Sequence, residues 1–299
     1  MTTTGDRTAL VPVVRCLGVP ITAHTPASAA RHVVERARQI REAREDDRTA
    51  GAARSDVHLC NAYTLALGEG DPALSQTLGS AFLNLADGQP VVWANRLLHR
   101  GTALPRTRVY GPDLMLGVFA LSQGTGLRHY LLGSTPQTLA ALRSELQRRF
   151  PRARLAGSFS PPFRPLTAEE LIRQEADILA SRADIVWVGL GTPLQDHRAA
   201  ELATRLPVVS VAVGAAFDFI GGNKRQAPSW MQHSGLEWAF RLLCEPRRLW
   251  RRYLFGNARF VRGVLRQAAS HTAPRRPAPP RGAPPGAGPH RFTSGGRRP

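Results

Sequence analysis

Along most of this chain, apolar runs alternate with segments that have the composition of helices. The runs lie at 57–60, 90–94, 129–133, 153–157, 184–191 and 207–214. They lack the alternation of a half-exposed strand, which is typical of strands covered by helices on both faces. Thr135 and Pro136 are a predicted N-cap and first helical residue for the segment at 135–150. The pattern predicts an α/β fold with a mainly parallel sheet and flanking helices.

The chain divides into four predicted segments. Residues 1–56 are expected to hold the first strand and helix and a charged loop, and residues 57–233 the α/β core. Residues 234–269 are predicted to form a basic, amphipathic helical appendage. Residues 270–299 consist largely of Pro, Gly and Arg, which bury too little apolar surface to offset the entropy of ordering, so this tail is predicted to be disordered.

The chain is strongly basic. Its 40 Lys and Arg residues exceed its 22 Asp and Glu residues, which gives a formal net charge of +18 over 299 residues. Such a surplus indicates a polyanionic partner: nucleic acid, an anionic membrane or a phosphate-bearing substrate. Composition alone does not distinguish among these three.

Cysteine spacing and hydropathy limit the compartment and the cofactors. Cys16, Cys60 and Cys244 are not spaced as in zinc sites or disulfide frameworks, so we expect no metal site and a reducing compartment. No run of 18 apolar residues occurs, and the N-terminus lacks the pattern of a signal peptide. We therefore expect a cytoplasmic protein.

Glycines end three of the predicted strands, at Gly133, at Gly189 with Gly191, and at Gly214. In parallel sheets, ligands bind beyond the carboxyl ends of the strands, where small residues let a nucleotide approach the backbone. A plain turn residue is the alternative for each glycine. Neither the GxGxxG fingerprint nor the GxxxxGK motif occurs, which disfavours ordinary dinucleotide and P-loop sites.

Eight segments together resemble one family. They are LGVPI (17–21), NAYTLALGEGD (61–71), ADGQPVVWANRL (86–97), RVYGPDLM (108–115), YLLGSTPQTL (130–139), VGLGTPLQD (188–196), VGAAFDFIGGNKRQAPSW (213–230) and GLEWAFRLLCEPRRLWRRY (235–253). In this order they are similar to the WecG/TagA/CpsF bacterial glycosyltransferases, glycosyltransferase family 26, and the expected fold is Rossmann-like. The chain departs from the family at Leu59, where Thr is usual, and at Asp196, where Glu is usual.

The resemblance implies a catalytic base that deprotonates an acceptor hydroxyl, and the matching residue here is Asp87. Since Asp87 precedes Gly88, a plain turn acid is the alternative. The departing diphosphate needs positive charge, for which Arg108, Lys224 and Arg225 are candidates. No Asp-x-Asp motif occurs, so we expect transfer without a metal ion and without a cofactor.

Polar side chains near the predicted strand ends are candidates for recognising the sugar and the nucleoside. Asn61, Gln195 and Asp196 carry amide and carboxylate groups that match hydroxyl groups and a uracil edge. Gly191 and Gly214 would let the donor approach the backbone. Asp196 is alternatively an acid in the first turn of a helix.

The basic segment after Gly235 is predicted to form two helices, because Pro246 ends the first and opens the second. One stripe is apolar and contains Trp238, Leu242, Leu249, Tyr253, Phe260 and Val264; a second contains arginines. Four arginines are candidates for contacting anionic lipid or a lipid diphosphate: Arg241, Arg248, Arg252 and Arg259. The alternative is an apolar stripe packed on the core beside solvated charges.

The resemblance implies an inverting glycosyltransferase of cell-surface polysaccharide synthesis. It would move a sugar, of N-acetylmannosamine or uronic acid type, from a UDP-sugar to a polyprenyl-diphosphate-linked saccharide on the inner face of the plasma membrane. Formation of a homo-oligomer stays open. Two other classes are a basic nucleic-acid-binding protein, for which no recognition motif occurs, and an α/β oxidoreductase, whose glycine fingerprint is absent.

Overall fold

A single mixed sheet organises the part of the chain that the structure describes. The computed structural model describes residues 11–46 and 54–272, without the side chains of Ser229, His233, Arg248, Arg252, His271 and Thr272. The predicted disordered tail therefore falls mostly outside the described residues, from residue 273 onward. The strands are β1 (Val13–Cys16), β2 (Val19–Thr22), β3 (Asp56–Cys60), β4 (Leu83–Ala86), β5 (Arg128–Gly133), β6 (Arg154–Phe159), β7 (Ile185–Gly189) and β8 (Val209–Ala212).

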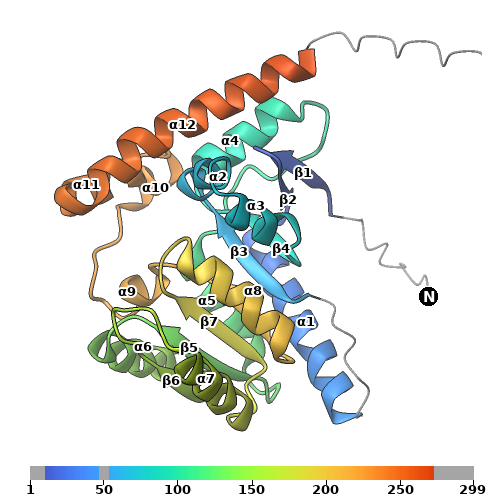
Figure 1. The fold of residues 1–299 in the computed structure, drawn as a ribbon, viewed down its shortest axis with the longest axis vertical. Coiled ribbons are helices and arrows are strands. Elements are labelled where there is room, and N and C mark those ends of the chain that lie inside the picture. Colours follow the sequence, from blue (N-terminus) through green and yellow to red (C-terminus); the bar gives the residue numbers. More distant parts are fainter. Residues whose placement is uncertain (1–10, 47–53, 273–299) are drawn as a thin grey trace, which may run out of the picture.

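The sheet has the order β1-β2-β4-β3-β8-β7-β5-β6. Only β1 and β2 pair antiparallel, and every other neighbouring pair is parallel. Because parallel neighbours need crossover connections, helices follow most of the strands (Figure 1). The predicted α/β class and the mainly parallel sheet are confirmed.

Twelve helices surround the sheet in the described residues. They are α1 (Pro26–Glu45), α2 (Ala62–Gly68), α3 (Pro72–Gly79), α4 (Gln89–Leu98), α5 (Gly111–Ser122), α6 (Pro136–Arg149), α7 (Ala168–Ala180), α8 (Leu194–Arg205), α9 (Ala216–Ile220), α10 (Ser229–His233), α11 (Glu237–Cys244) and α12 (Pro246–Thr272). Thr135 caps α6 by accepting a hydrogen bond from the Thr138 backbone, and α12 begins at Pro246, as predicted.

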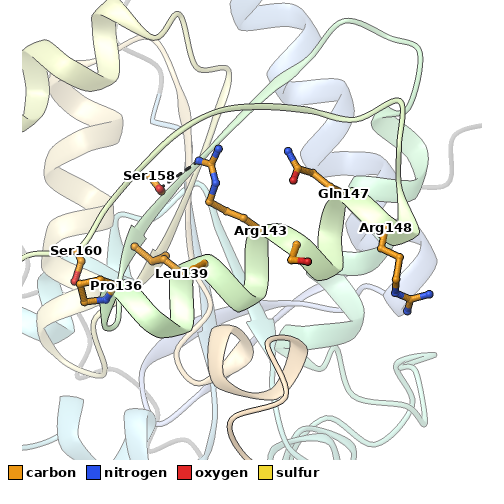
Figure 2. A pocket seen from close by; sticks show the side chains of 9 residues that line it. Pro136, Leu139, Arg143, Gln147, Arg148, Ser158 and Ser160 are labelled. Carbon is orange, nitrogen blue, oxygen red and sulfur yellow. Dashed lines mark hydrogen bonds between the residues drawn. The ribbon is translucent and has the colours of Figure 1, made fainter.

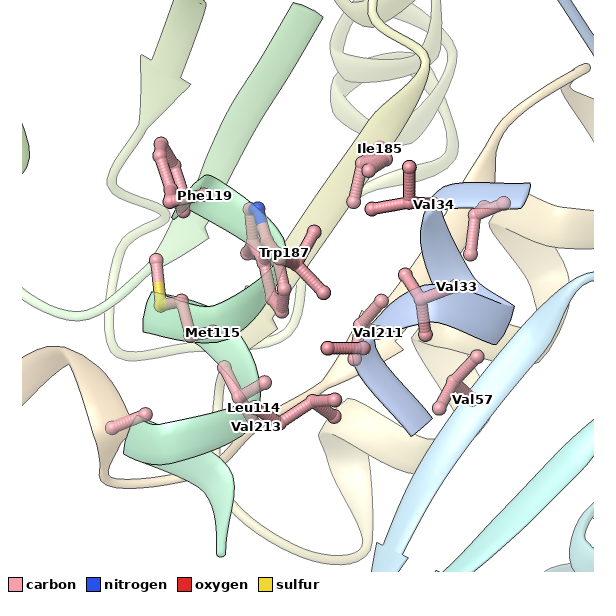
Figure 3. Packing of buried hydrophobic residues seen from close by; sticks show 14 of the residues in the cluster. Val33, Val34, Val57, Leu114, Met115, Phe119, Ile185, Trp187, Val211 and Val213 are labelled. Atoms are coloured by element: carbon pink, nitrogen blue, oxygen red, sulfur yellow. The ribbon is translucent and has the colours of Figure 1, made fainter. Parts of the chain in front are cut away.

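Alternating side chains of the central strands bury the two faces of the sheet. Ile185 and Trp187 of β7 pack with α1 and α5 in the largest core cluster (Figure 3). Val186 and Val188 point to the other face, where α7 and α8 supply Ile178 and other apolar side chains. The residues of β7 from Ile185 to Val188 thus each meet an apolar layer, which is why this strand is continuously apolar.

A separate apolar cluster joins the C-terminal helix to the β1–β2 end of the sheet. Phe260 and Val264 of α12 pack with Leu65 of α2 and Val91 of α4. Figure 1 shows α12 at this end of the molecule and α6 with β6 at the other. Part of the apolar stripe predicted in the appendage is therefore a packing surface.

Residues 90–94 belong to the helix α4, so the predicted strand there is wrong. Val91 and Val92 favour strands by propensity, but Pro90 starts a helix whose buried residues recur at helical spacing while Trp93 is exposed. The strand of this region is β4, which is not among the predicted strands because its four residues include the polar Asn84. Asn84 is nevertheless buried and donates hydrogen bonds to the carbonyls of Pro20 and Leu78.

Candidate functional site

The carboxyl ends of the parallel strands border a cavity of about 370 Å³. Gly191 and Gly214 line it with φ angles of 82° and 59°, a left-handed backbone that favours glycine. At the end of β5, a Cβ on Gly133 would collide with the Gly189 carbonyl oxygen. The glycines predicted from sequence therefore meet at one end of the sheet, where they allow close backbone approach. We call this space the strand-end cavity.

A second, smaller cavity of about 100 Å³ lies between the strand ends and the helices α11 and α12. Its wall includes the aromatic residues Tyr63, Trp238 and Tyr253. We call it the appendage cavity. The two cavities have four lining residues in common: Asn61, Asp87, Tyr110 and Arg241. These residues form the junction between the two spaces.

Asp87 occupies this junction directly after β4. Its backbone N–H donates to the Cys60 carbonyl at 3.0 Å, which ties the turn to β3. The Asn61 Oδ1 accepts from the Thr64 backbone and caps α2, and the Asn61 side chain also hydrogen-bonds Asp87. Burial raises the pKa of Asp87 to about 6, although Arg108 and Arg241 act in the opposite direction. A carboxyl group with this pKa is ionised at neutral pH, and it binds a proton when the pH falls below about 6.

Arg108 connects this acid to the appendage. Its guanidinium lies 4.1 Å from the centre of the Tyr110 ring, donates to Gln232 at 3.1 Å and pairs with Glu237 of α11. Arg108 lines the appendage cavity but not the strand-end cavity. Its charge therefore acts beside Asp87, while its hydrogen bonds to Gln232 and Glu237 hold α10 and α11 in place.

The remaining basic candidates separate into two groups. Lys224 and Arg241 line the strand-end cavity, where Lys224 Nζ lies 3.4 Å from Asp218 and 3.3 Å from Glu245. Arg225 and Arg259 are exposed and line neither cavity. The candidates Arg248 and Arg252 fall on side chains outside the described set. Arg241, predicted as a lipid contact, is thus the cation that both cavities share.

The first turn of α8 uses its polar side chains to bind neighbouring elements. Gln195 lines the strand-end cavity and accepts from the Gly191 N–H at 3.0 Å, which holds the loop after β7. His197 contacts Thr77 of α3 at 3.1 Å, and Arg198 binds Gln174 of α7. The polar run that follows the strand-end glycines therefore anchors α8 on several sides.

Asp196, predicted as a substrate contact, faces the protein interior instead. Its carboxylate lies 3.0 Å from His58 Nδ1, and His58 Nε2 lies 3.0 Å from Asp56. Arg54 donates two hydrogen bonds to Asp56, so two cationic groups alternate with two carboxylates. The side chains of Asp56, His58 and Asp196 are almost fully buried. Burial lowers the pKa of His58, but the hydrogen bonds that its ring donates to both carboxylates, together with their charges, outweigh burial and raise this pKa to about 9.

An open groove of about 800 Å³ runs along α6 and β6, apart from both cavities (Figure 2). Arg143 Nη1 donates to Ser158 Oγ across it at 3.3 Å. The described residues that line it include no Asp, Glu or His, so none of them can act as a carboxylate or imidazole base. The groove is larger than the strand-end cavity but, among its described lining residues, has no acid comparable to Asp87.

Several residues that line the two cavities were not among the predicted site residues. Tyr110 lines both cavities, Glu237 and Trp238 line the appendage cavity, and Phe163 lines the strand-end cavity. Glu237, one of two acids in the otherwise basic segment at 234–269, was an available signal. Among the residues that the structure describes, no group of three or more His, Cys, Asp or Glu side chains is arranged to hold a metal ion. No helix in the described ranges is long and apolar enough to cross a membrane.

Fold and site define an α/β protein with a cavity beyond the carboxyl ends of a mainly parallel sheet and an acid at the junction of this cavity with a second one. The family model of the glycosyl transferase WecG/TagA/CpsF family matches residues 14–274. This match covers most of the chain, and the protein belongs to that family. It is therefore a glycosyltransferase of a family that acts in cell-surface polysaccharide synthesis.

Proposed function

We propose that the protein is an inverting transferase that moves a sugar, of N-acetylmannosamine or uronic acid type, from a UDP-sugar to a polyprenyl-diphosphate-linked saccharide. The observation that carries the proposal is the place of Asp87, at the junction of the two cavities. A base that separates donor from acceptor can take the proton of the acceptor hydroxyl while that oxygen attacks the sugar from the opposite side to the diphosphate. This geometry inverts the configuration at the anomeric carbon.

The donor occupies the strand-end cavity in this proposal. The Gly191 and Gly214 backbone admits its diphosphate, and Lys224 and Arg241 line the same space and offset the charge that develops on the leaving group. No step then needs a divalent metal. Turnover is expected to persist in excess EDTA, and its loss with recovery on adding Mg²⁺ or Mn²⁺ would contradict this part of the proposal.

The acceptor enters through the appendage cavity, whose aromatic residues Trp238 and Tyr253 provide flat apolar surfaces for a sugar ring. The carboxylate of Glu237, bound to Arg108, keeps α11 over this entrance. The acceptor's lipid requires a membrane nearby, and the outer face of α12 has the composition to meet one. Trp250, Leu254, Val261 and Leu265 are exposed there at spacings of four and seven residues.

Arginines flank this exposed stripe. Arg247, Arg251 and Arg262 are exposed on α12, and anionic headgroups attract such side chains while the stripe enters the interface. We therefore propose peripheral binding to the anionic inner face of the plasma membrane. The membrane surface consists of Trp250, Leu254, Val261, Leu265 and these arginines, rather than the apolar stripe that packs on the body.

The direct test is a transfer assay with a panel of UDP-sugars and a short-chain, diphosphate-linked lipid saccharide. The expected result is one glycosylated lipid product whose anomeric configuration, measured by NMR, is opposite to that of the donor. A product with retained configuration would contradict Asp87 as a base in a single displacement. Absence of UDP release with every donor would contradict the UDP-sugar assignment.

A further inference from the structure

Phe163 is the most exposed large apolar side chain at the strand-end cavity. It is 93% exposed, yet it is one of the residues that line this cavity. No aromatic partner is recorded for its ring among the contacts of the described residues. An uncovered aromatic ring at the rim of a ligand cavity is a surface on which a flat group can stack.

The loop that carries Phe163 is held at both ends. On one side, Ser160 Oγ donates to the Ser134 carbonyl at 2.7 Å, and Ser134 itself lines the cavity. On the other side, Arg164 binds Glu170 with two hydrogen bonds of 2.7 and 2.8 Å. Prolines at 161, 162 and 165 further restrict the backbone. The ring is thus presented in a restricted position, which lowers the entropy cost of stacking on it.

The order of the strands gives the cavity two chemically different ends. Asp87 follows β4, and Phe163 lies in the loop after β6; between β4 and β6 the sheet order is β3, β8, β7 and β5. Five intervals of roughly 4.8 Å between neighbouring strands separate β4 from β6 by about 24 Å. The glycines Gly214 and Gly191 follow the two middle strands. The carboxylate of Asp87, the glycine backbone and the Phe163 ring therefore follow one another along the row of strand ends.

We propose that Phe163 is the stacking platform for the nucleobase of the donor, and that the donor lies along the strand ends with its base at Phe163 and its sugar at Asp87. This inference rests on the proposed function, since it assigns an orientation to the UDP-sugar in the strand-end cavity. The diphosphate then crosses the glycines of β7 and β8, where the backbone approaches most closely. Ser134 and Thr135 lie beside the nucleoside, because they follow β5, the neighbour of β6.

Titration calorimetry with UDP and with inorganic pyrophosphate tests this orientation. Phe163→Ala is expected to weaken UDP binding about tenfold or more, since stacking on one aromatic ring contributes strongly to binding of a base. Binding of pyrophosphate, which has no base, should stay unchanged, and Phe163→Tyr should restore UDP binding. The matched control is Ile172→Ala on α7, a 64% exposed apolar residue that lines neither cavity. It should leave both affinities unchanged.

The outcomes separate the two proposals. If the wild type binds UDP and Phe163→Ala binds it equally well, the stacking assignment is overturned while the proposed function stands. If Phe163→Ala weakens UDP and pyrophosphate alike, the residue supports the cavity but does not stack on the base, and the assignment is again overturned. If the wild type binds no UDP, the proposed donor is wrong and this orientation fails with it.

Discussion

Burial raises the pKa of the Cys60 thiol, and the nearby Asp196 and Asp87 raise it further, yet the surroundings of these two acids differ. Asp196 is sealed in the interior, with His58 as its partner. Asp87 lines two cavities, and burial leaves its pKa raised to about 6 despite the nearby Arg108 and Arg241. An aspartate is therefore structural where a dedicated cation partners it, and chemically available where burial outweighs its cationic neighbours.

The sharpest test of this contrast is Asp87→Asn. The amide keeps the shape of the side chain but cannot accept the acceptor proton, so turnover is expected to fall by roughly 10²- to 10⁴-fold. UDP affinity should be retained, and the free energy of unfolding should not fall, since burial disfavours the charged carboxylate. Transfer rates, UDP titration and urea unfolding measure the three quantities. Turnover near that of the wild type would remove Asp87 from the mechanism.

The buried network of Asp56, His58 and Asp196 is tested by the change His58→Leu. It leaves Asp56 and Asp196 buried without their shared partner, and loss of one partner of a buried pair costs about 3–5 kcal/mol in the free energy of unfolding. Urea unfolding measures this cost. The control is Arg148→Leu, which breaks an exposed pair with Glu145 and should change stability little.

Turnover distinguishes the two acids further. In the fraction of His58→Leu that folds, turnover per molecule should fall far less than in Asp87→Asn, because His58 touches neither cavity. Equal loss of stability in His58→Leu and Arg148→Leu would show that the buried network of Asp56, His58 and Asp196 does not stabilise the fold.

The two groups should also respond to pH in opposite ways. The pKa of His58 is raised from 6.5 to about 9, so its stabilisation is complete below pH 6.5 and is lost as the pH rises through 9. That loss should be about 3 kcal/mol, because one pKa unit corresponds to about 1.4 kcal/mol. Turnover should instead rise as the pH passes upward through about 6, where Asp87 loses its proton.

Urea unfolding between pH 6.5 and 9.5 measures the first effect, with His58→Gln as the comparison. The variant should lose most of the decline in stability across this range. A decline of the same size in His58→Gln would assign it to other groups. For turnover, a pH profile that is flat across pH 5 to 7 would contradict Asp87 as the titrating base.

The sequence was most informative where the pattern is local. Continuous apolar strands and the Thr135 cap follow from neighbouring residues, and both were predicted. The predicted strand at 90–94 was wrong because Val91 and Val92 favour strands by local propensity. The helix observed there depends on Pro90 and on packing against α12. Local propensity does not contain that packing.

The same limit applies to the site. The strand-end glycines could be predicted to meet, since parallel strands end together. The pairing of Arg108 with Glu237 joins residues 129 positions apart, and no sequence spacing predicts it. Whether Asp196 faces the cavity or His58 depends on the rotation of α8 about its axis, which an isolated motif leaves undetermined. Asp87 came from the resemblance rather than from its local sequence.

The helix α12 also has a buried face and an exposed face, and changes on the exposed face have the smallest expected effect of those considered. Leu249, Tyr253 and Phe260 are buried against the body, whereas Trp250 and Leu254 are exposed. Changing Trp250 and Leu254 together to Ser should release the protein from vesicles rich in anionic lipid, because the apolar anchor is lost. Changing Arg251 and Arg262 to Gln should weaken binding by about 1 kcal/mol for each arginine, less at high salt.

Neither pair of changes should lower the melting temperature, since these side chains are exposed in the free protein. The matched control is Phe260→Ser, on the sealed face of the same helix, which should lower the melting temperature because Phe260 belongs to the cluster with α2 and α4. Co-sedimentation with vesicles of graded anionic content, alongside melting curves, measures both. If the exposed pairs lower the melting temperature but leave sedimentation unchanged, the outer face of α12 packs against protein, and the membrane assignment is wrong.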